Sequence, residues 1–123
     1  MKFLCFSLFL IFCSCKNKET VDLLIENDFF KIENVCIFDT LYYNVKVMNL
    51  STAEIHIDTL VASCECVSIE KGIKLLKANQ IDSVKVRFVA ETSGYISRGF
   101  SIKYNKKVKN VIIEGYVRNT NEE

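Results

Sequence analysis

Apolar and polar side chains alternate along most of the chain from residue 28 onward, and this period of two constrains the fold more than any other feature. Successive side chains of a β-strand point to opposite faces, so the pattern predicts strands with one buried face. The apolar sets that share a face are Leu41, Tyr43, Val45 and Val47; Ile55, Ile57, Thr59 and Val61; Val84, Val86, Phe88 and Ala90; Ile96, Phe100, Ile102 and Tyr104; and Val111, Ile113, Gly115 and Val117.

Further strands are expected at residues 29–35, 66–70 and 73–76, and Asn105 and Lys106 are expected at the tip of a hairpin. No segment shows a helical period over twelve residues. About seven short strands, with turn residues roughly every ten positions, are typical of an immunoglobulin-like sandwich. We therefore expect an all-β, antiparallel β-sandwich over residues 28–119 and a C-terminal tail at 120–123. A small barrel is the alternative.

The N-terminus has the layout of an export signal that ends at a lipid-attachment cysteine. Lys2 precedes an apolar run from Phe3 to Phe12, and Ser14 is a small residue directly before Cys15. This order is typical of a secretory signal, and the run is much shorter than the ~20 residues that span a bilayer. We expect a signal peptide at residues 1–14, lipidation of Cys15 and a tether up to residue 27. A plain cleaved signal and a hydrophobic N-terminal tail are the alternatives.

Charge excludes one class of partner. Without residues 1–14, which hold one lysine and no acid, 15 basic and 15 acidic residues remain. A neutral chain lacks the clustered positive charge that nucleic-acid binding requires. About a hundred residues form one domain with a single core. We expect no nucleic-acid partner and one domain.

Several segments resemble a known family, the Hydin-like, immunoglobulin-fold domain of unknown function found in bacterial envelope lipoproteins. Residues 45–49 (Val-Lys-Val-Met-Asn) match its strand entry, and residues 55–66 match its core signature, which ends in Ser-Cys-Gly-Cys. Residues 94–98 and 111–117 resemble its later strands, including the closing Gly-x-Val. The resemblance covers about residues 41–118 and implies a fold and an envelope location, but no activity.

The sequence departs from this family at a few positions. Glu65 replaces the glycine between the two cysteines, Val67 replaces a usual threonine, and Ala78 and Asn79 replace a common Pro-Gly pair. A backbone conformation that requires glycine between the cysteines is therefore not expected here.

Cys36, Cys64 and Cys66 are the cysteines that follow Cys15. An exported protein meets conditions in which disulfides persist, and three cysteines allow one intrachain bridge. A bridge from Cys36 to Cys64 or Cys66 would be structural. A Cys64–Cys66 bridge would need a bend, since Cα atoms two residues apart in a strand lie about 6.5 Å from each other. Inert thiols, and a redox or metal-handling pair at Cys64 and Cys66, remain open.

Catalytic residues are not indicated. His56 is the single histidine and is expected on the exposed face of its strand, without a nucleophile beside it. We expect no enzyme activity, no metal site and no cofactor. Tyr42, Tyr95 and Tyr116 fall on outward faces, where tyrosines offer contact area for a protein or a glycan. Packing against a loop or edge is the alternative role for these rings.

Taken together, these features predict a lipid-anchored lipoprotein of the cell envelope, facing the periplasm or the cell surface. Its non-catalytic immunoglobulin-like domain would serve protein interaction or envelope architecture, with an unidentified envelope protein or glycan as partner. The alternative functions are a thiol redox or metal-handling module at Cys64 and Cys66, and glycan binding through the exposed tyrosines.

Overall fold

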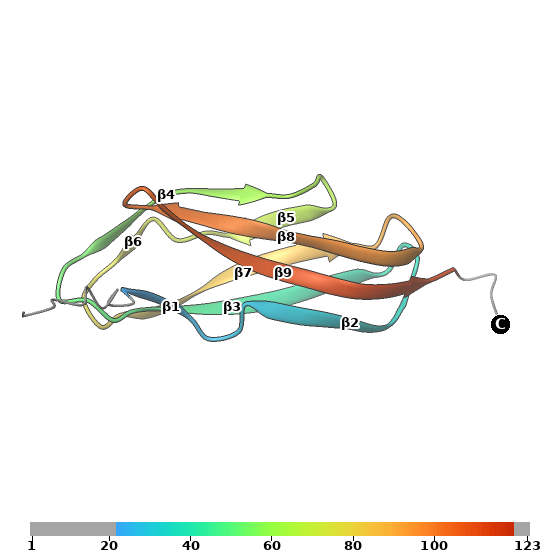
Figure 1. The fold of residues 1–123 in the computed structure, drawn as a ribbon, viewed down its shortest axis with the longest axis horizontal. Helices are drawn as coiled ribbons and strands as arrows, with labels where there is room; N and C mark the ends of the chain where they lie inside the picture. Colours follow the sequence, from blue (N-terminus) through green and yellow to red (C-terminus); the bar gives the residue numbers. More distant parts are fainter. Residues whose placement is uncertain (1–21, 120–123) are drawn as a thin grey trace, which may run out of the picture.

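A computed structural model describes residues 22–119, which contain strands and no helix (Figure 1). The nine strands are β1 (Leu23–Ile25), β2 (Phe29–Cys36), β3 (Thr40–Asn49), β4 (Ile55–Ala62), β5 (Val67–Lys71), β6 (Leu75–Leu76), β7 (Ile81–Val89), β8 (Gly94–Tyr104) and β9 (Lys107–Arg118).

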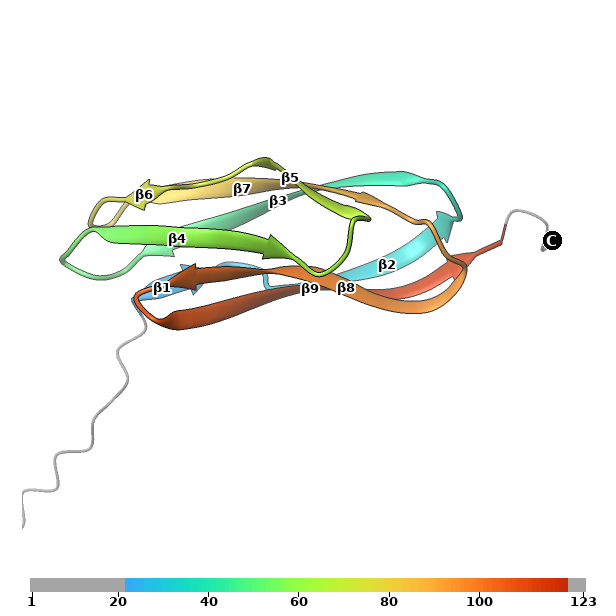
Figure 2. The same ribbon diagram turned by 90° about the horizontal axis from the view of Figure 1, so that it is seen from above.

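The strands form two sheets that pack face to face as a sandwich (Figure 2). One sheet has the order β1-β3-β7-β5 and the other the order β2-β9-β8-β4-β6. Every pairing is antiparallel except that of β2 with β9, which is parallel. The predicted all-β, immunoglobulin-like sandwich is confirmed. The described residues form nine strands rather than about seven, and two of the nine, β1 and β6, are only three and two residues long.

The buried faces follow the predicted alternation in most strands. Val45 and Val47 on β3, and Ile102 and Tyr104 on β8, are at most 2% exposed. The buried sets on the other long strands are Val84, Val86 and Phe88, followed by Ala90, and Val111, Ile113 and Val117. These side chains form one core cluster between the two sheets.

The prediction for β4 is wrong in its second half. Thr59 and Val61 were expected inside, but both are exposed, and Leu60 and Ala62 pack against the core instead. The cause is a β-bulge: Ile57 lies opposite Tyr104 and Thr59 opposite Lys103, so Asp58 is an extra residue on β4. One extra residue shifts the alternation and sends the following side chains to the other face.

The folded body begins before residue 28, because β1 lies inside the segment expected to be a tether and pairs with β3. The start of β1 and the hairpin between β8 and β9 lie at one end of the sandwich, whereas β9 ends at the other (Figures 1 and 2). Asn105 and Lys106 form that hairpin tip, as predicted, and both have positive φ, as a two-residue type I′ turn requires.

The predicted signal at residues 1–14, the lipidation site at Cys15, most of the tether and the tail at 120–123 lie outside the described residues. Within residues 22–119, no helix is long and apolar enough to cross a membrane.

Candidate functional site

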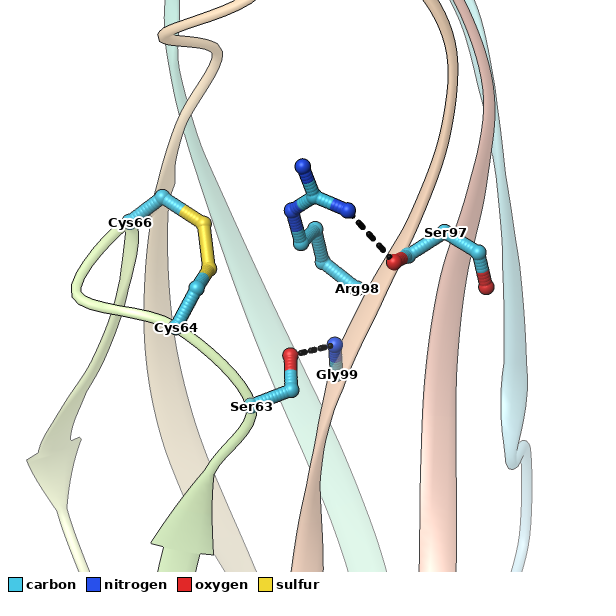
Figure 3. Close-up of a disulfide and its surroundings, with 6 residues drawn as sticks. All are labelled: Ser63, Cys64, Cys66, Ser97, Arg98 and Gly99. Carbon is cyan, nitrogen blue, oxygen red and sulfur yellow. Dashed lines mark hydrogen bonds between the residues drawn. A yellow bond between two sulfur atoms is a disulfide. The ribbon is translucent and has the colours of Figure 1, made fainter.

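A disulfide between Cys64 and Cys66 lies in the loop from β4 to β5 (Figure 3). The backbone N–H of Val67 donates to the carbonyl oxygen of Cys64 over 3.3 Å, and this turn brings the two cysteine Cα atoms to 5.2 Å. That separation lies within the range that a disulfide spans. The bend expected for a Cys64–Cys66 bridge is therefore present, and Cys36 is not bridged in this structure.

The bridge closes a very small loop. On the chain-entropy estimate, a three-residue loop contributes about 1–2 kcal/mol to stability, compared with about 3–4 kcal/mol for a loop of some thirty residues. Glu65, between the cysteines, is exposed and has no left-handed φ, so the turn does not require the glycine that the family usually has here. The bridge is thus a minor contributor to fold stability.

Hydrogen bonds hold the disulfide loop to both sheets. The Ser63 N–H donates to the carbonyl oxygen of Gly99 over 2.8 Å, and the Gly99 N–H donates to Ser63 Oγ over 2.9 Å. On the other side, the Val89 N–H on β7 donates to the carbonyl oxygen of Cys66 over 2.9 Å. The serine of the Ser-Cys-x-Cys signature therefore attaches the loop to β8, independently of the disulfide.

The two bridged cysteines differ in accessibility. Cys66 is 7% exposed and belongs to the core cluster, whereas Cys64 is partly exposed and packs at its margin. Figure 3 shows the guanidinium of Arg98, a β8 residue, on the side of the loop to which the two sulfur atoms point. Arg98 Nη1 donates to the Ser97 carbonyl oxygen over 3.0 Å.

Cys36 is not bridged. It is partly exposed at the end of β2, where Arg118 Nη2 lies 3.9 Å from its Sγ. His56 is exposed, as predicted, and its Nε2 lies 3.9 Å from Glu54 Oε2. In the described part of the chain, no group of three or more His, Cys, Asp or Glu side chains is arranged to hold a metal ion.

The three candidate tyrosines are all exposed, but they do not form one surface. Tyr95 and Tyr116 lie directly opposite each other on β8 and β9, with exposed fractions of 69% and 52%. Tyr42 lies on β3 in the other sheet, with Lys85 Nζ 5.8 Å from its ring centroid. Desolvation, and then the Glu114 carboxylate, raise the pKa of Tyr95. Of the three tyrosines, Tyr95 and Tyr116 can therefore belong to one binding surface for a glycan or protein, and Tyr42 cannot.

β4 has an open edge that was not predicted from the sequence. β6 pairs only with Ile55 and His56, so in the described structure residues 58–62 of β4 have β8 as their one partner strand. A groove of ≈ 390 Å³ runs beside this stretch and is lined by Ile57, Asp58, Thr59, Leu60, Ile69, Gly72, Ile73 and Lys74. The groove lies between the edge of one sheet and β5 at the edge of the other.

The model of the HYDIN/CFA65/VesB-like, Ig-like domain family matches residues 16–116, which is most of the chain. The chain belongs to this family. The predicted resemblance to Hydin-like domains is therefore confirmed, and the HYDIN/CFA65/VesB-like match extends it to residues before β1. No curated protein matches the chain significantly.

Solved structures share the fold at low identity. A PapD-like domain of human CEP192 superposes with a TM-score of 0.60 at 11% identity, covering 80% of this chain and 87% of that one. A protein of unknown function from Porphyromonas gingivalis W83 gives 0.64 at 8% identity, covering 77% and 46%. The VesB protease of Vibrio cholerae gives 0.60 at 14% identity, covering 79% of this chain but only 32% of the protease.

These likenesses show the fold alone. The chain spans about half of the Porphyromonas gingivalis protein and a third of VesB, and most of the CEP192 domain.

Proposed function

We propose that this HYDIN/CFA65/VesB-like domain is a lipid-anchored protein of the bacterial cell envelope that binds a partner protein by strand addition at β4. The observation that carries the proposal is the stretch at residues 58–62, which pairs with β8 on one side, has no partner strand on its other side in the described structure, and lies beside the groove. An edge strand offers unpaired N–H and C=O groups, and an extended segment that joins the edge places alternate side chains into neighbouring pockets.

The positions that would bind follow from the hydrogen-bond pattern. Ser63 donates its N–H to β8, and successive N–H groups of a strand point to opposite sides. The Ala62 N–H therefore points to the open edge. Leu60 and Ile69 line the groove beside it, so the partner segment is expected to carry apolar side chains at alternate positions.

The anchor part of the proposal rests on the sequence around Cys15. Replacement of Cys15 with serine is expected to release the protein from membranes in fractionation. Membrane association that survives the Cys15→Ser change would contradict lipidation at this residue.

The binding part is tested with a photo-crosslinking residue placed at Thr59 in the full chain. A matched control carries it at Lys109, which is on β9 away from the open edge. We expect a partner to be captured only from position 59. Its binding should weaken at least tenfold with Ala62→Pro, which removes the edge N–H, and remain unchanged with Ala62→Val. Equal capture from both positions, or full binding by Ala62→Pro, would contradict strand addition.

A further inference from the structure

Beyond partner binding, we infer that Cys64 and Cys66 form a thiol–disulfide exchange site for low-molecular-weight thiols, with Cys64 as the attacked cysteine. Three structural features carry this inference: a bridge across one intervening residue, a difference in exposure between the two cysteines, and a loop held without the bridge.

The bridge is not needed to keep the loop in place. Ser63 and Gly99 exchange two hydrogen bonds, and Val89 donates to the Cys66 carbonyl oxygen. These contacts involve no sulfur atom, so they persist when the bridge opens. The two thiols then stay in the same turn, ready to form the bridge again.

The difference in exposure assigns the roles of the two sulfurs. Cys64 is partly exposed, so a small thiolate can reach it, whereas Cys66 is 7% exposed and shielded by the core. Cys66 is therefore the leaving group in the forward step and the attacking thiolate in the reverse step.

The exchange balances with a thiol RSH as reductant. A thiolate RS⁻ attacks Cys64 Sγ, the Cys64–Cys66 bond breaks, and Cys66 leaves as a thiolate. A second RS⁻ attacks the RS sulfur of the mixed disulfide, which forms RSSR and releases Cys64 as a thiolate. Both cysteine thiolates take up protons from solvent. The protein disulfide gains two electrons, and two RSH molecules lose them.

The test uses the full chain in detergent, equilibrated in buffers of reduced and oxidised glutathione, then alkylated and mapped by peptide mass spectrometry. We expect Cys64 and Cys66 to become alkylated together as reduced glutathione increases, while far-UV circular dichroism stays that of the folded protein. A structural disulfide resists this thiol pool. Replacement of Cys36 with serine should leave the transition unchanged.

Single variants test the assigned roles. Cys66→Ser should trap glutathione on Cys64 at least about tenfold faster than Cys64→Ser traps it on Cys66, because thiol reactivity follows exposure. The inference is overturned if the bridge stays oxidised at the highest glutathione ratio, if it opens only in urea, or if both variants are modified at equal rates. The wild-type titration decides the question even if a variant does not fold. Neither result depends on strand addition at β4.

Discussion

Tyr104 Oη donates a hydrogen bond to Asp22 Oδ1 over 2.8 Å, which joins two residues that lie 82 positions apart. Asp22 directly precedes β1, and Tyr104 is the last residue of β8 before the hairpin tip. Lys107 Nζ, on β9, lies 2.9 Å from the second carboxylate oxygen of Asp22. The start of the folded body is therefore fixed to the hairpin between β8 and β9.

Tyr104→Phe should destabilise the domain. The phenol is fully buried, and the change removes a hydrogen bond to a charged group, which costs about 1–2 kcal/mol in a partly exposed pair. The midpoint of urea unfolding measures the loss. Asp22→Asn in the Tyr104→Phe background should add less than it does alone, because the two residues share this contact. Full additivity would show that they act independently.

The same contact predicts a dependence on pH. Burial raises the pKa of Asp22, but hydrogen bonds from Lys107, Tyr104 and the Leu23 N–H outweigh it and lower this pKa from 3.8 to about 2. A carboxylate with a lowered folded-state pKa stabilises the fold above its unfolded pKa, and this stabilisation disappears as pH falls through the folded value. The stability difference between wild type and Asp22→Asn should therefore be constant above about pH 5 and shrink towards pH 2. A difference that grows on acidification would contradict this assignment.

Asn49→Asp should be strongly destabilising. The Asn49 side chain is fully buried, and its Nδ2 donates to the carbonyl oxygens of Ala53, Leu76 and Lys77 over 2.8–3.1 Å. An aspartate would place a carboxylate oxygen against these acceptors, at a cost of more than about 3 kcal/mol. Thermal unfolding near neutral pH measures the effect. Asn44→Asp, on the exposed face of the same strand, is the control and should change stability by less than about 0.5 kcal/mol.

Gly115→Ala should also destabilise, by about 3 kcal/mol. Gly115 has φ 155°, and an added Cβ would lie 2.8 Å from the Ile32 Cβ on the parallel neighbour β2. Gly94→Ala is the control, because Gly94 also has positive φ but a Cβ there meets open space. Denaturant unfolding should show a clearly larger loss at position 115. Equal losses would mean that β2 shifts without cost.

Phe38→Gly should stabilise the domain by about 1 kcal/mol, because a left-handed conformation is costly for a bulky residue. Phe38 has φ 72° in the turn between β2 and β3, and its side chain is 73% exposed. Phe29→Gly, within β2, is the control and should destabilise. Thermal unfolding compares the two. A loss of stability with Phe38→Gly would show that the ring makes contacts that outweigh its backbone strain.

Alternation alone was sufficient to predict the fold class and the buried faces of β3, β7, β8 and β9. The prediction failed where a strand is too short, or too interrupted, for a period of two to appear. β1 has three residues, too few for a period to be visible, and Asp58 interrupts the period within β4. The parallel pairing of β2 with β9 leaves no local mark on either strand.

The candidate site was partly predictable. The Ser-Cys-x-Cys motif located the disulfide loop, but only the turn at Val67 decides that Cys64 pairs with Cys66 rather than Cys36. Tyr42, Tyr95 and Tyr116 are exposed, as predicted from the alternation. The strand order nevertheless places Tyr42 in one sheet and the other two in the second sheet. The open edge of β4 depends on the shortness of β6, which the sequence pattern around Leu75 does not show.

The bulge at Asp58 could be removed without changing which side chains of β4 are buried. With Asp58 deleted, Ile57 would be followed directly by Thr59, and a regular strand would still place Ile57, Leu60 and Ala62 inside. The extra residue is therefore dispensable for burial. Its effect is on the outer edge, since a bulge interrupts the flat backbone that edge-to-edge association of identical copies requires. Asp58, an exposed charge at this interruption, would thus protect the domain from aggregation while leaving residues 59–62 open.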